Sequence, residues 1–211
     1  MYIYHVFTEF IFADRKIILG GIGALLGFAG YLYYYVNIFF RGGNKPSLFT
    51  WIPLSLVTGF GFYAQLKTGG LWGSAVTGVT AFNVFIVAII SLFCEKKKPE
   101  WSDWVCFIGS LVAIAWWRIS SGLIMPVIIV SFADAIAFFP TWKNGYRDPF
   151  KETMGMWFLN CIKFVFGIAA IGTYSITTLL FPLSIATIDG TFLLTIFFRR
   201  KYLLSKQGRT L

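Results

Sequence analysis

Three charged side chains lie inside long apolar segments of this sequence: Asp134, Lys163 and Asp189. A charge at the centre of a bilayer costs roughly 2.5 to 3.5 kcal/mol on insertion scales, so such a residue usually faces the interior of a helix bundle and a partner. Asn160 lies three residues before Lys163, on the same helical face. Burial and pairing perturb the pKa values of such groups, which is typical of working sites. The cluster could therefore hold a polar or zwitterionic solute, or couple its movement to a proton.

The same residues have a purely structural interpretation, in which a buried ion pair fixes helix packing and touches no solute. Both interpretations predict that Lys163 lies near at least one of the two aspartates. Asn83, in another apolar segment, could line a cavity or form an interhelical hydrogen bond. Pro182 interrupts an apolar segment and Pro140 ends one, so both are candidate hinges.

The elements that carry these residues are long apolar segments. Of 211 residues, 57% are hydrophobic and 13% are charged, against about a quarter charged in soluble domains. Seven stretches approach or exceed the roughly 20 apolar residues that a spanning helix needs, and none alternates as barrel strands do. The sequence thus predicts an all-α membrane protein with seven transmembrane helices. They are Lys16–Phe40, Leu48–Leu66, Leu71–Phe93, Trp101–Trp117, Gly122–Pro140, Thr153–Ile171 and Tyr174–Phe198.

The distribution of basic residues predicts an orientation. Thirteen of the 18 Lys and Arg residues fall on one side of the predicted spans and four on the other, while Lys163 lies within a span. The positive-inside rule then places the N-terminus outside and the C-terminus in the cytoplasm, and a bacterial inner membrane is the predicted location. The net charge of +9 is explained by this topology together with attraction to the lipid bilayer, so no nucleic-acid partner is expected.

The sequence also predicts an internal repeat. A shift of 103 residues places the basic turn after the first span on the one after the fifth, bringing Gly42 onto Gly145 and Pro46 onto Pro149. It also brings Gly69 onto Gly172, and Lys96 to Lys98 onto Arg199 to Lys201. The matching register of turns, rather than the number of identities, indicates two blocks of three spans.

One span between two blocks of three gives both blocks the same orientation, so seven helices arranged as 3+1+3 parallel repeats are expected. The predicted segments are an N-terminal interfacial or extracytoplasmic segment, a first three-helix repeat, a linker helix, a second three-helix repeat and a cytoplasmic tail. Their limits are 1–15, 16–98, 99–121, 122–201 and 202–211.

The stretch "PTWKNGYRDPFKET" (Pro140–Thr153) is similar to the Pro-Gln turn of the PQ-loop and SWEET superfamily, and the predicted topology resembles that family over nearly the whole chain. Thr141 stands where the family has Gln, and the first half has Asn37 where the proline would be. The substrate site of the family therefore cannot be transferred residue by residue. The resemblance implies alternating-access transport of a small solute without ATP, by a divergent branch.

Three functions remain open at this point. The first is a solute transporter, and the second is a seven-span receptor or sorting protein that binds a ligand without moving it. The third is a retinal protein, in which Lys163 would form the Schiff base, but retinal proteins carry that lysine in the last span, where this chain has Asp189. No enzyme activity, cofactor or metal is expected, because the single histidine, His5, lies near the N-terminus without other ligands. A homo-oligomer is left open.

Overall fold

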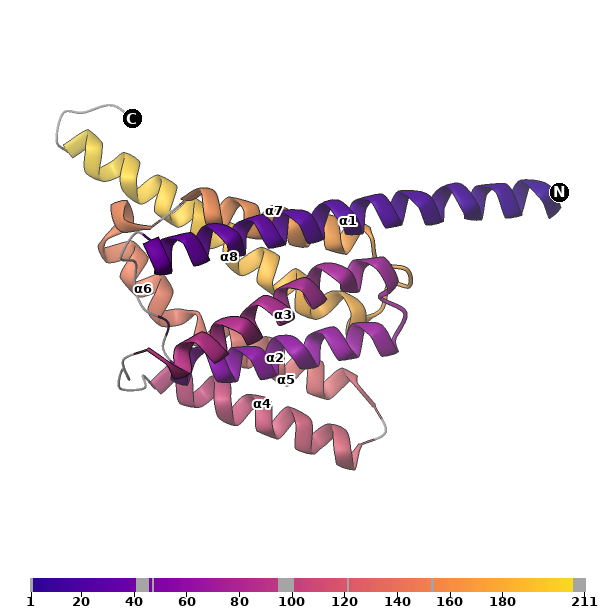
Figure 1. Ribbon diagram of the computed structural model, residues 1–211, viewed down its shortest axis with the longest axis horizontal. Coiled ribbons are helices and arrows are strands. Elements are labelled where there is room, and N and C mark those ends of the chain that lie inside the picture. The colour runs from indigo at the N-terminus through magenta and orange to yellow at the C-terminus, as the bar shows by residue number, and fades with distance from the viewer. Residues whose placement is uncertain are drawn as a thin grey trace.

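The computed structural model describes residues 2–40, 46, 48–94, 101–120, 122–152 and 154–206, and these residues form helices and turns without a strand. The helices run roughly along the long axis of the molecule, alternating in direction (Figure 1). Their bounds are α1 (Tyr2–Phe40), α2 (Leu48–Lys67), α3 (Leu71–Leu92), α4 (Trp101–Ile119), α5 (Ile124–Ala137), α6 (Phe139–Arg147), the 3-10 helix η1 (Pro149–Lys151), α7 (Met154–Ala169) and α8 (Ile176–Lys206).

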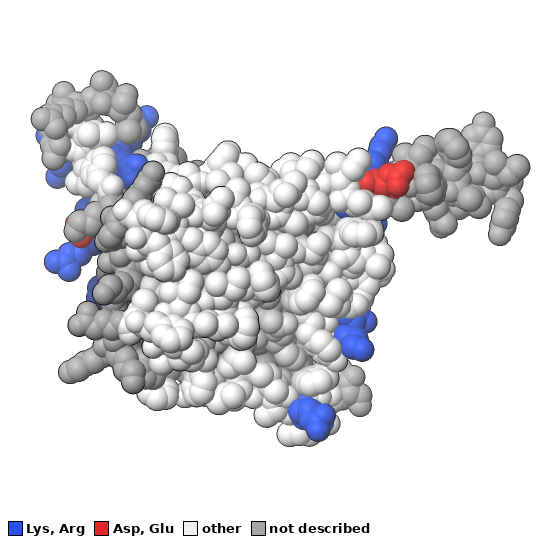
Figure 2. Space-filling model, in the orientation of Figure 1, with Lys and Arg blue, Asp and Glu red and all other residues white. Residues whose placement is uncertain are grey.

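Four helical segments of the described chain are long and apolar enough to cross a membrane: 14–40, 71–92, 124–147 and 176–206. Two further apolar helices, 107–119 and 154–169, are shorter. Figure 2 shows Lys and Arg gathered at the two ends of the bundle, with a broad band free of charged residues between them on this face. This distribution is that of a helical membrane protein, because charged side chains avoid the hydrocarbon layer.

The order in which the helices pack is similar in the two parts of the chain. Helix α3 contacts both α1 and α2, and α8 likewise contacts both α5 and α7. Helix α4 packs against α5 and α2. The two groups meet where α7 contacts α1 and α3, and where α2 contacts α5 and α8.

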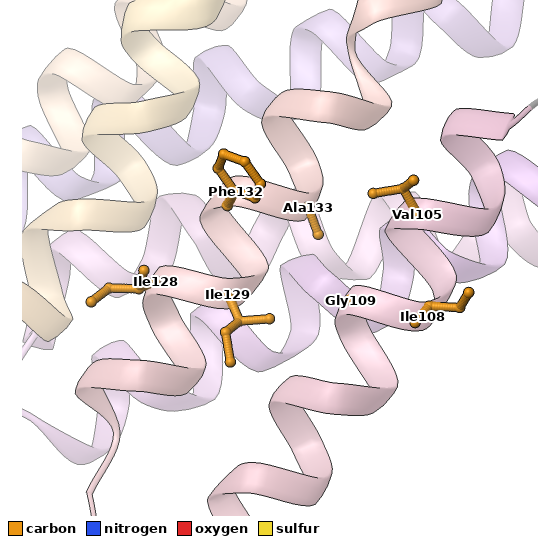
Figure 3. Close-up of a pocket in the computed structure, with 7 residues that line it drawn as sticks. All are labelled: Val105, Ile108, Gly109, Ile128, Ile129, Phe132 and Ala133. Carbon is orange, nitrogen blue, oxygen red and sulfur yellow. The ribbon is translucent and has the colours of Figure 1, made fainter.

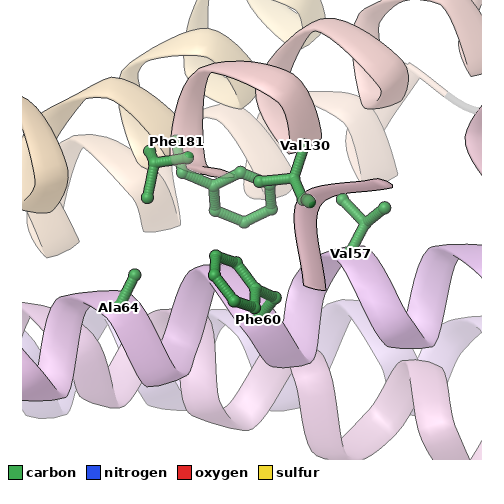
Figure 4. Packing of buried hydrophobic residues seen from close by; sticks show 7 residues of the cluster. Val57, Phe60, Ala64, Val130 and Phe181 are labelled. Atoms are coloured by element: carbon green, nitrogen blue, oxygen red, sulfur yellow. The ribbon is translucent and has the colours of Figure 1, made fainter. Parts of the chain in front are cut away.

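The contact of α2 with α5 and α8 is apolar. Val57 and Phe60 of α2 lie in a buried cluster with Val130 of α5 and Phe181 of α8 (Figure 4). Val57 and Phe181 are almost completely buried. Because lipid chains are as apolar as these side chains, close packing rather than exclusion of water must hold the helices together here.

Two glycine turns meet at the end of the bundle near Lys16. Gly69, in the turn after α2, has a φ of +88°, a conformation that favours glycine, and its carbonyl accepts a hydrogen bond of 2.9 Å from the backbone N–H of Thr173. The N–H of Gly172 donates to the carbonyl of Gly70 at 3.4 Å, and Lys16 Nζ donates to the carbonyl of Gly172 at 3.0 Å. The connections α2–α3 and α7–α8 are thereby joined.

The basic turn predicted over Pro140–Thr153 is largely helical, which corrects the expectation of a span that stops at Pro140. Helix α6 begins at Phe139, and the apolar segment continues to Arg147. Pro140 is the second residue of α6, where a missing backbone N–H does not interrupt the helical hydrogen bonds. Only η1 and its flanks form a turn, and Arg200 of α8 donates hydrogen bonds to the carbonyls of Pro149 and Glu152 there.

The predicted boundary at residue 15 also falls inside a helix. Helix α1 runs without a break from Tyr2 to Phe40, so the backbone of the N-terminal segment continues the first span. A membrane-crossing segment can be assigned within it from Asp14 onward.

Candidate functional site

Lys163 is buried at the contact between α7 and α1. Its side chain is 1% exposed, and Nζ lies 5.1 Å from the ring centroid of Tyr31 on α1 and 4.9 Å from that of Phe164. An ammonium group over an aromatic face is attracted by the ring quadrupole, most strongly where water is excluded. Tyr31 therefore supplies part of the environment that replaces water around this lysine.

Two glycines of α1 give Lys163 its room. A Cβ atom at Gly23 would lie 2.9 Å from the backbone carbonyl oxygen of Lys163, and one at Gly27 would lie 3.2 Å from its Cδ. Gly23, Gly27 and Tyr31 follow each other at intervals of four residues and share one face of α1. The aliphatic part of the Lys163 side chain passes beside Gly27, and its ammonium group ends over the Tyr31 ring.

Asp189 is the acidic residue whose charge stabilises the ammonium group of Lys163. It lies on α8, is 2% exposed, and its carboxylate accepts a hydrogen bond from Asn160 Nδ2. Asp189 and Lys163 interact electrostatically. Asn160 and Lys163 lie one turn apart on α7, so one face of this helix carries both the amide that donates to Asp189 and the ammonium group that interacts with it electrostatically. The structure thus brings together three of the predicted residues.

Asp134, on α5, completes the charged cluster. It is half-buried and interacts electrostatically with both Asp189 and Tyr31. Among the described side chains, none donates a hydrogen bond to its carboxylate or forms an ion pair with it. Ser131, one turn earlier on α5, is buried and its hydroxyl has no hydrogen-bond partner. Asp134 is therefore the least satisfied member of the cluster, and it is more accessible than Lys163 or Asp189.

Asn83 lies in a neighbouring hydrogen-bonded pair. It is buried on α3, its Nδ2 donates to the carbonyl of Val79 at 2.8 Å, and its Oδ1 accepts from the hydroxyl of Tyr35 at 3.0 Å. Tyr35 follows Tyr31 by one turn of α1. Asn83 thus joins α3 to α1 one helical turn from Tyr31. Its direct contact with a solute stays a prediction.

The two candidate hinge prolines differ in position. Pro140 lies at the start of α6, near the end of the bundle that also carries the C-terminus. Pro182 is buried inside α8, seven residues before Asp189, and the helix continues through it. Neither residue is in the cluster, and motion about either stays a prediction.

Tyr31 was not among the site residues predicted from the sequence, although two signals pointed to it. The shift of 103 residues places Tyr31 opposite Asp134, and Tyr31 continues the spacing of Gly23 and Gly27. A cluster of four aromatic rings was also not predicted from the sequence. Phe138, Trp142, Trp157 and Phe192 stack edge to face, with centroids 4.8 to 6.2 Å apart.

An apolar pocket lies apart from the charged cluster. It has a volume of 370 Å³ and lies between α4 and α5 (Figure 3). No charged side chain and no side-chain hydrogen-bonding group lines it, so it offers nothing to orient a polar solute. Its lining residues are Val105, Ile108, Gly109, Ile128, Ile129, Phe132 and Ala133.

In the part of the chain that the structure describes, no three His, Cys, Asp or Glu residues are placed to hold a metal ion. The charged cluster itself offers ionic and hydrogen-bonding groups. Comparison with known proteins adds nothing to this assignment, because no family model, curated protein or solved structure matches the chain.

Proposed function

We propose that this chain is an integral membrane transporter that moves a small polar or zwitterionic solute by alternating access. The site would lie between two three-helix halves, α1 to α3 and α5 to α8, with α4 as the linker. The observation that carries the proposal is the buried cluster of Lys163, Asp189 and Asn160 facing Tyr31 of the other half. Burying opposite charges in apolar helices is costly, and such sites commonly mark solute or ion pathways.

The packing order supports two related halves. In each group of three spans, the last helix packs against both others: α3 against α1 and α2, and α8 against α5 and α7. The contacts between the two groups also correspond. The shift of 103 residues equates α1 with α5 and α2 with α7, so the contact of α1 with α7 is equivalent to that of α5 with α2. Gly69 and Gly172, which the same shift equates, lie in connections that hydrogen-bond to each other. Equivalent elements meet in this way near a two-fold axis along the membrane normal.

Corresponding positions differ in chemistry, which supports a single asymmetric site. The shift equates Phe60 with Lys163 and Val130 with Gly27. Phe60 and Val130 pack in an apolar cluster, whereas Lys163 extends beside Gly27. One interface between the halves would thus hold the bundle together, while the other would bind the solute.

The resemblance to the PQ-loop and SWEET superfamily agrees with this proposal in topology alone. In transporters with parallel repeats, solute sites lie near the midplane between the halves. Gln65 Nε2 of α2 donates to the carbonyl of Thr178 on α8 at 2.9 Å. Together with the joined glycine turns, this bond links the helices at the end of the bundle that would face outside in the proposed orientation.

The proposal is tested by solute uptake into vesicles that contain the purified protein. A thermal-shift screen against a panel of small metabolites would first identify ligands, since a ligand at about 100 times its dissociation constant adds roughly 2.7 kcal/mol of stability. Labelled hits would then be offered to vesicles with the wild-type protein, the Lys163→Met variant, or the Lys67→Met variant. Lys67 is the matched control, because it lies at the exposed end of α2.

Transport predicts uptake that Lys163→Met abolishes and Lys67→Met retains. Binding of a hit without uptake would contradict transport and favour the second candidate, a receptor or sorting protein on the same scaffold. If neither binding nor uptake depended on Lys163 in a folded variant, the cluster would be a packing element alone.

A further inference from the structure

The formal charges of the cluster do not balance. Two carboxylates, Asp134 and Asp189, interact with each other and with Tyr31, whereas the one ammonium group, Lys163, interacts with Asp189 and lies over the Tyr31 ring. The structure describes no other Lys or Arg in electrostatic contact with these groups. When all three groups are ionised, the cluster has one excess negative charge in an apolar interior, where an uncompensated charge is unfavourable.

The excess charge can be assigned to Asp134. Asp189 has a hydrogen bond from Asn160 and the field of Lys163, and it is 2% exposed. Asp134 has neither kind of partner among the described side chains, and it is the more accessible of the two. A buried carboxylate without a partner takes up a proton or binds a cation, and a cation for Asp134 would come from outside the described chain.

A second and independent observation lies one turn away on the same helix. Ser131 is 6% exposed, and its hydroxyl has no hydrogen-bond partner. Buried hydroxyl groups are ordinarily paired, and an unpaired one is unfavourable. Residues three apart share a face of a helix, so a hydroxyl acceptor and a carboxylate are available side by side on α5.

We propose that Asp134 and Ser131 bind the ammonium group of the solute, so that the protein selects solutes that carry a primary ammonium group. The ammonium group has three donors, which the Asp134 carboxylate and the Ser131 hydroxyl can accept. Lys163, neutralised by Asp189, leaves no free positive charge to attract an anion. This inference rests on the proposed transport function and adds the substrate class to it.

The experiment compares solutes that are matched in length but differ in charge. Vesicles containing the wild-type protein are offered labelled cadaverine, lysine, norleucine, glutarate and glucose at one concentration. Cadaverine and glutarate have the same five-carbon chain with ammonium or carboxylate ends. Uptake is then repeated with Asp134→Asn, Asp134→Glu and Ser131→Ala, and with Asp14→Asn as the control at an exposed carboxylate near the end of the bundle.

The inference predicts uptake of cadaverine or lysine at least about tenfold above that of glutarate and glucose, since a hydrogen bond to a charged group contributes about this much. Asp134→Asn should remove that preference, and Ser131→Ala should weaken it. Asp14→Asn should leave it unchanged. Asp134→Glu keeps the charge and should retain the preference, which separates loss of charge from loss of folding.

Two results would overturn the inference while leaving transport intact. One is uptake of glucose or glutarate equal to that of cadaverine, which is expected if a bound proton neutralises Asp134. The other is an unchanged preference for ammonium groups in a folded Asp134→Asn variant. No uptake of any panel member, nor of any hit of the thermal-shift screen, would instead overturn the proposed function and the inference with it.

Discussion

At the scale of single residues, the molecule is defined by how it compensates buried charge. Lys163 has Asp189 and two aromatic rings near it, and Asp189 has an amide donor from Asn160. Removing one member of a buried pair leaves the other without compensation, and typically costs 3 to 5 kcal/mol. Removing both charges is far less costly, because no isolated charge remains.

A double-mutant cycle at Lys163 and Asp189 would measure this compensation. Lys163→Met should lower the free energy of unfolding by about 3 to 5 kcal/mol. Combining it with Asp189→Asn should recover much of that loss, since an amide at position 189 can still accept a hydrogen bond from Asn160. Thermal unfolding in detergent would measure both. If the effects of the two substitutions simply added, Lys163 and Asp189 would not be coupled.

At the scale of the elements, α1 approaches α7 closely because of glycine. A Cβ atom at Gly23 would lie 2.7 Å from Val76 Cγ2 and 2.9 Å from the backbone carbonyl oxygen of Lys163, and the backbone cannot yield as a flexible side chain would. Gly21, only two residues earlier on the same helix, has no atom within 4 Å of such a Cβ. The two positions form a natural pair for comparison.

Gly23→Ala is expected to separate α1 from α7 and to lower stability by about 1 to 3 kcal/mol, the usual cost of overpacking. Gly21→Ala should be neutral or stabilising by up to about 1 kcal/mol, because alanine favours a helix over glycine. Melting temperatures in one detergent would compare them. A neutral Gly23→Ala variant would mean that α1 does not pack on α7 as described.

The turn between α6 and α7 depends on α8. Arg200 donates to the carbonyl of Pro149 at 2.9 and 2.8 Å and to that of Glu152 at 2.6 Å, and its guanidinium lies 5.4 Å from the Phe150 ring. Lys201, the next residue, is exposed. By sequence, Arg200 belonged only to the basic cluster that ends the second repeat. Its hydrogen bonds show that it also has a structural role.

Arg200→Met should release the η1 turn and cost about 1 to 3 kcal/mol, the usual range for unsatisfied buried acceptors. Lys201→Met, which removes the same charge, should have little effect. Hydrogen exchange of the amides from 146 to 152 would report the change locally. Equal protection in the two variants would contradict the capping role of Arg200.

At the scale of the whole molecule, the charges lie at the two ends of the bundle with an uncharged band between them (Figure 2). The excess of Lys and Arg at the end that carries the C-terminus leads to the proposed orientation, with that end in the cytoplasm. Seven spans also require the two termini to lie on opposite sides, whereas four would place them on the same side.

A reporter experiment distinguishes a chain with seven spans from one with four. Green fluorescent protein fused after Leu211 should fluoresce in a bacterial host, and alkaline phosphatase fused there should be inactive, because that end is expected to be cytoplasmic. Alkaline phosphatase inserted next to Lys67 or Arg118 should be active, since both residues lie at the opposite end. An active phosphatase at Leu211 would contradict the proposed topology.

Composition and segment length were enough to predict a helical membrane protein, because the bilayer imposes a length and a polarity on each spanning helix. Buried charge likewise identified Lys163, Asp189 and Asp134, since a bilayer makes such residues costly to keep. Local sequence did not predict that α6 would continue the fifth span. There Gly145 allows α6 to approach Phe192, a tertiary contact that competes with turn formation.

The partners of the charged residues were decided by tertiary structure alone. Nothing local to Tyr31 shows that its ring will lie over Lys163, which is 132 positions further along the chain. Asn160 could be placed beside Lys163 from helical spacing, but its hydrogen bond to Asp189 depends on how α7 packs against α8. Sequence thus determined which residues need partners, because that need comes from the membrane. Only the packing of helices distant in sequence determined which partners they have, and it left Asp134 without a hydrogen-bond or ion-pair partner among the described side chains.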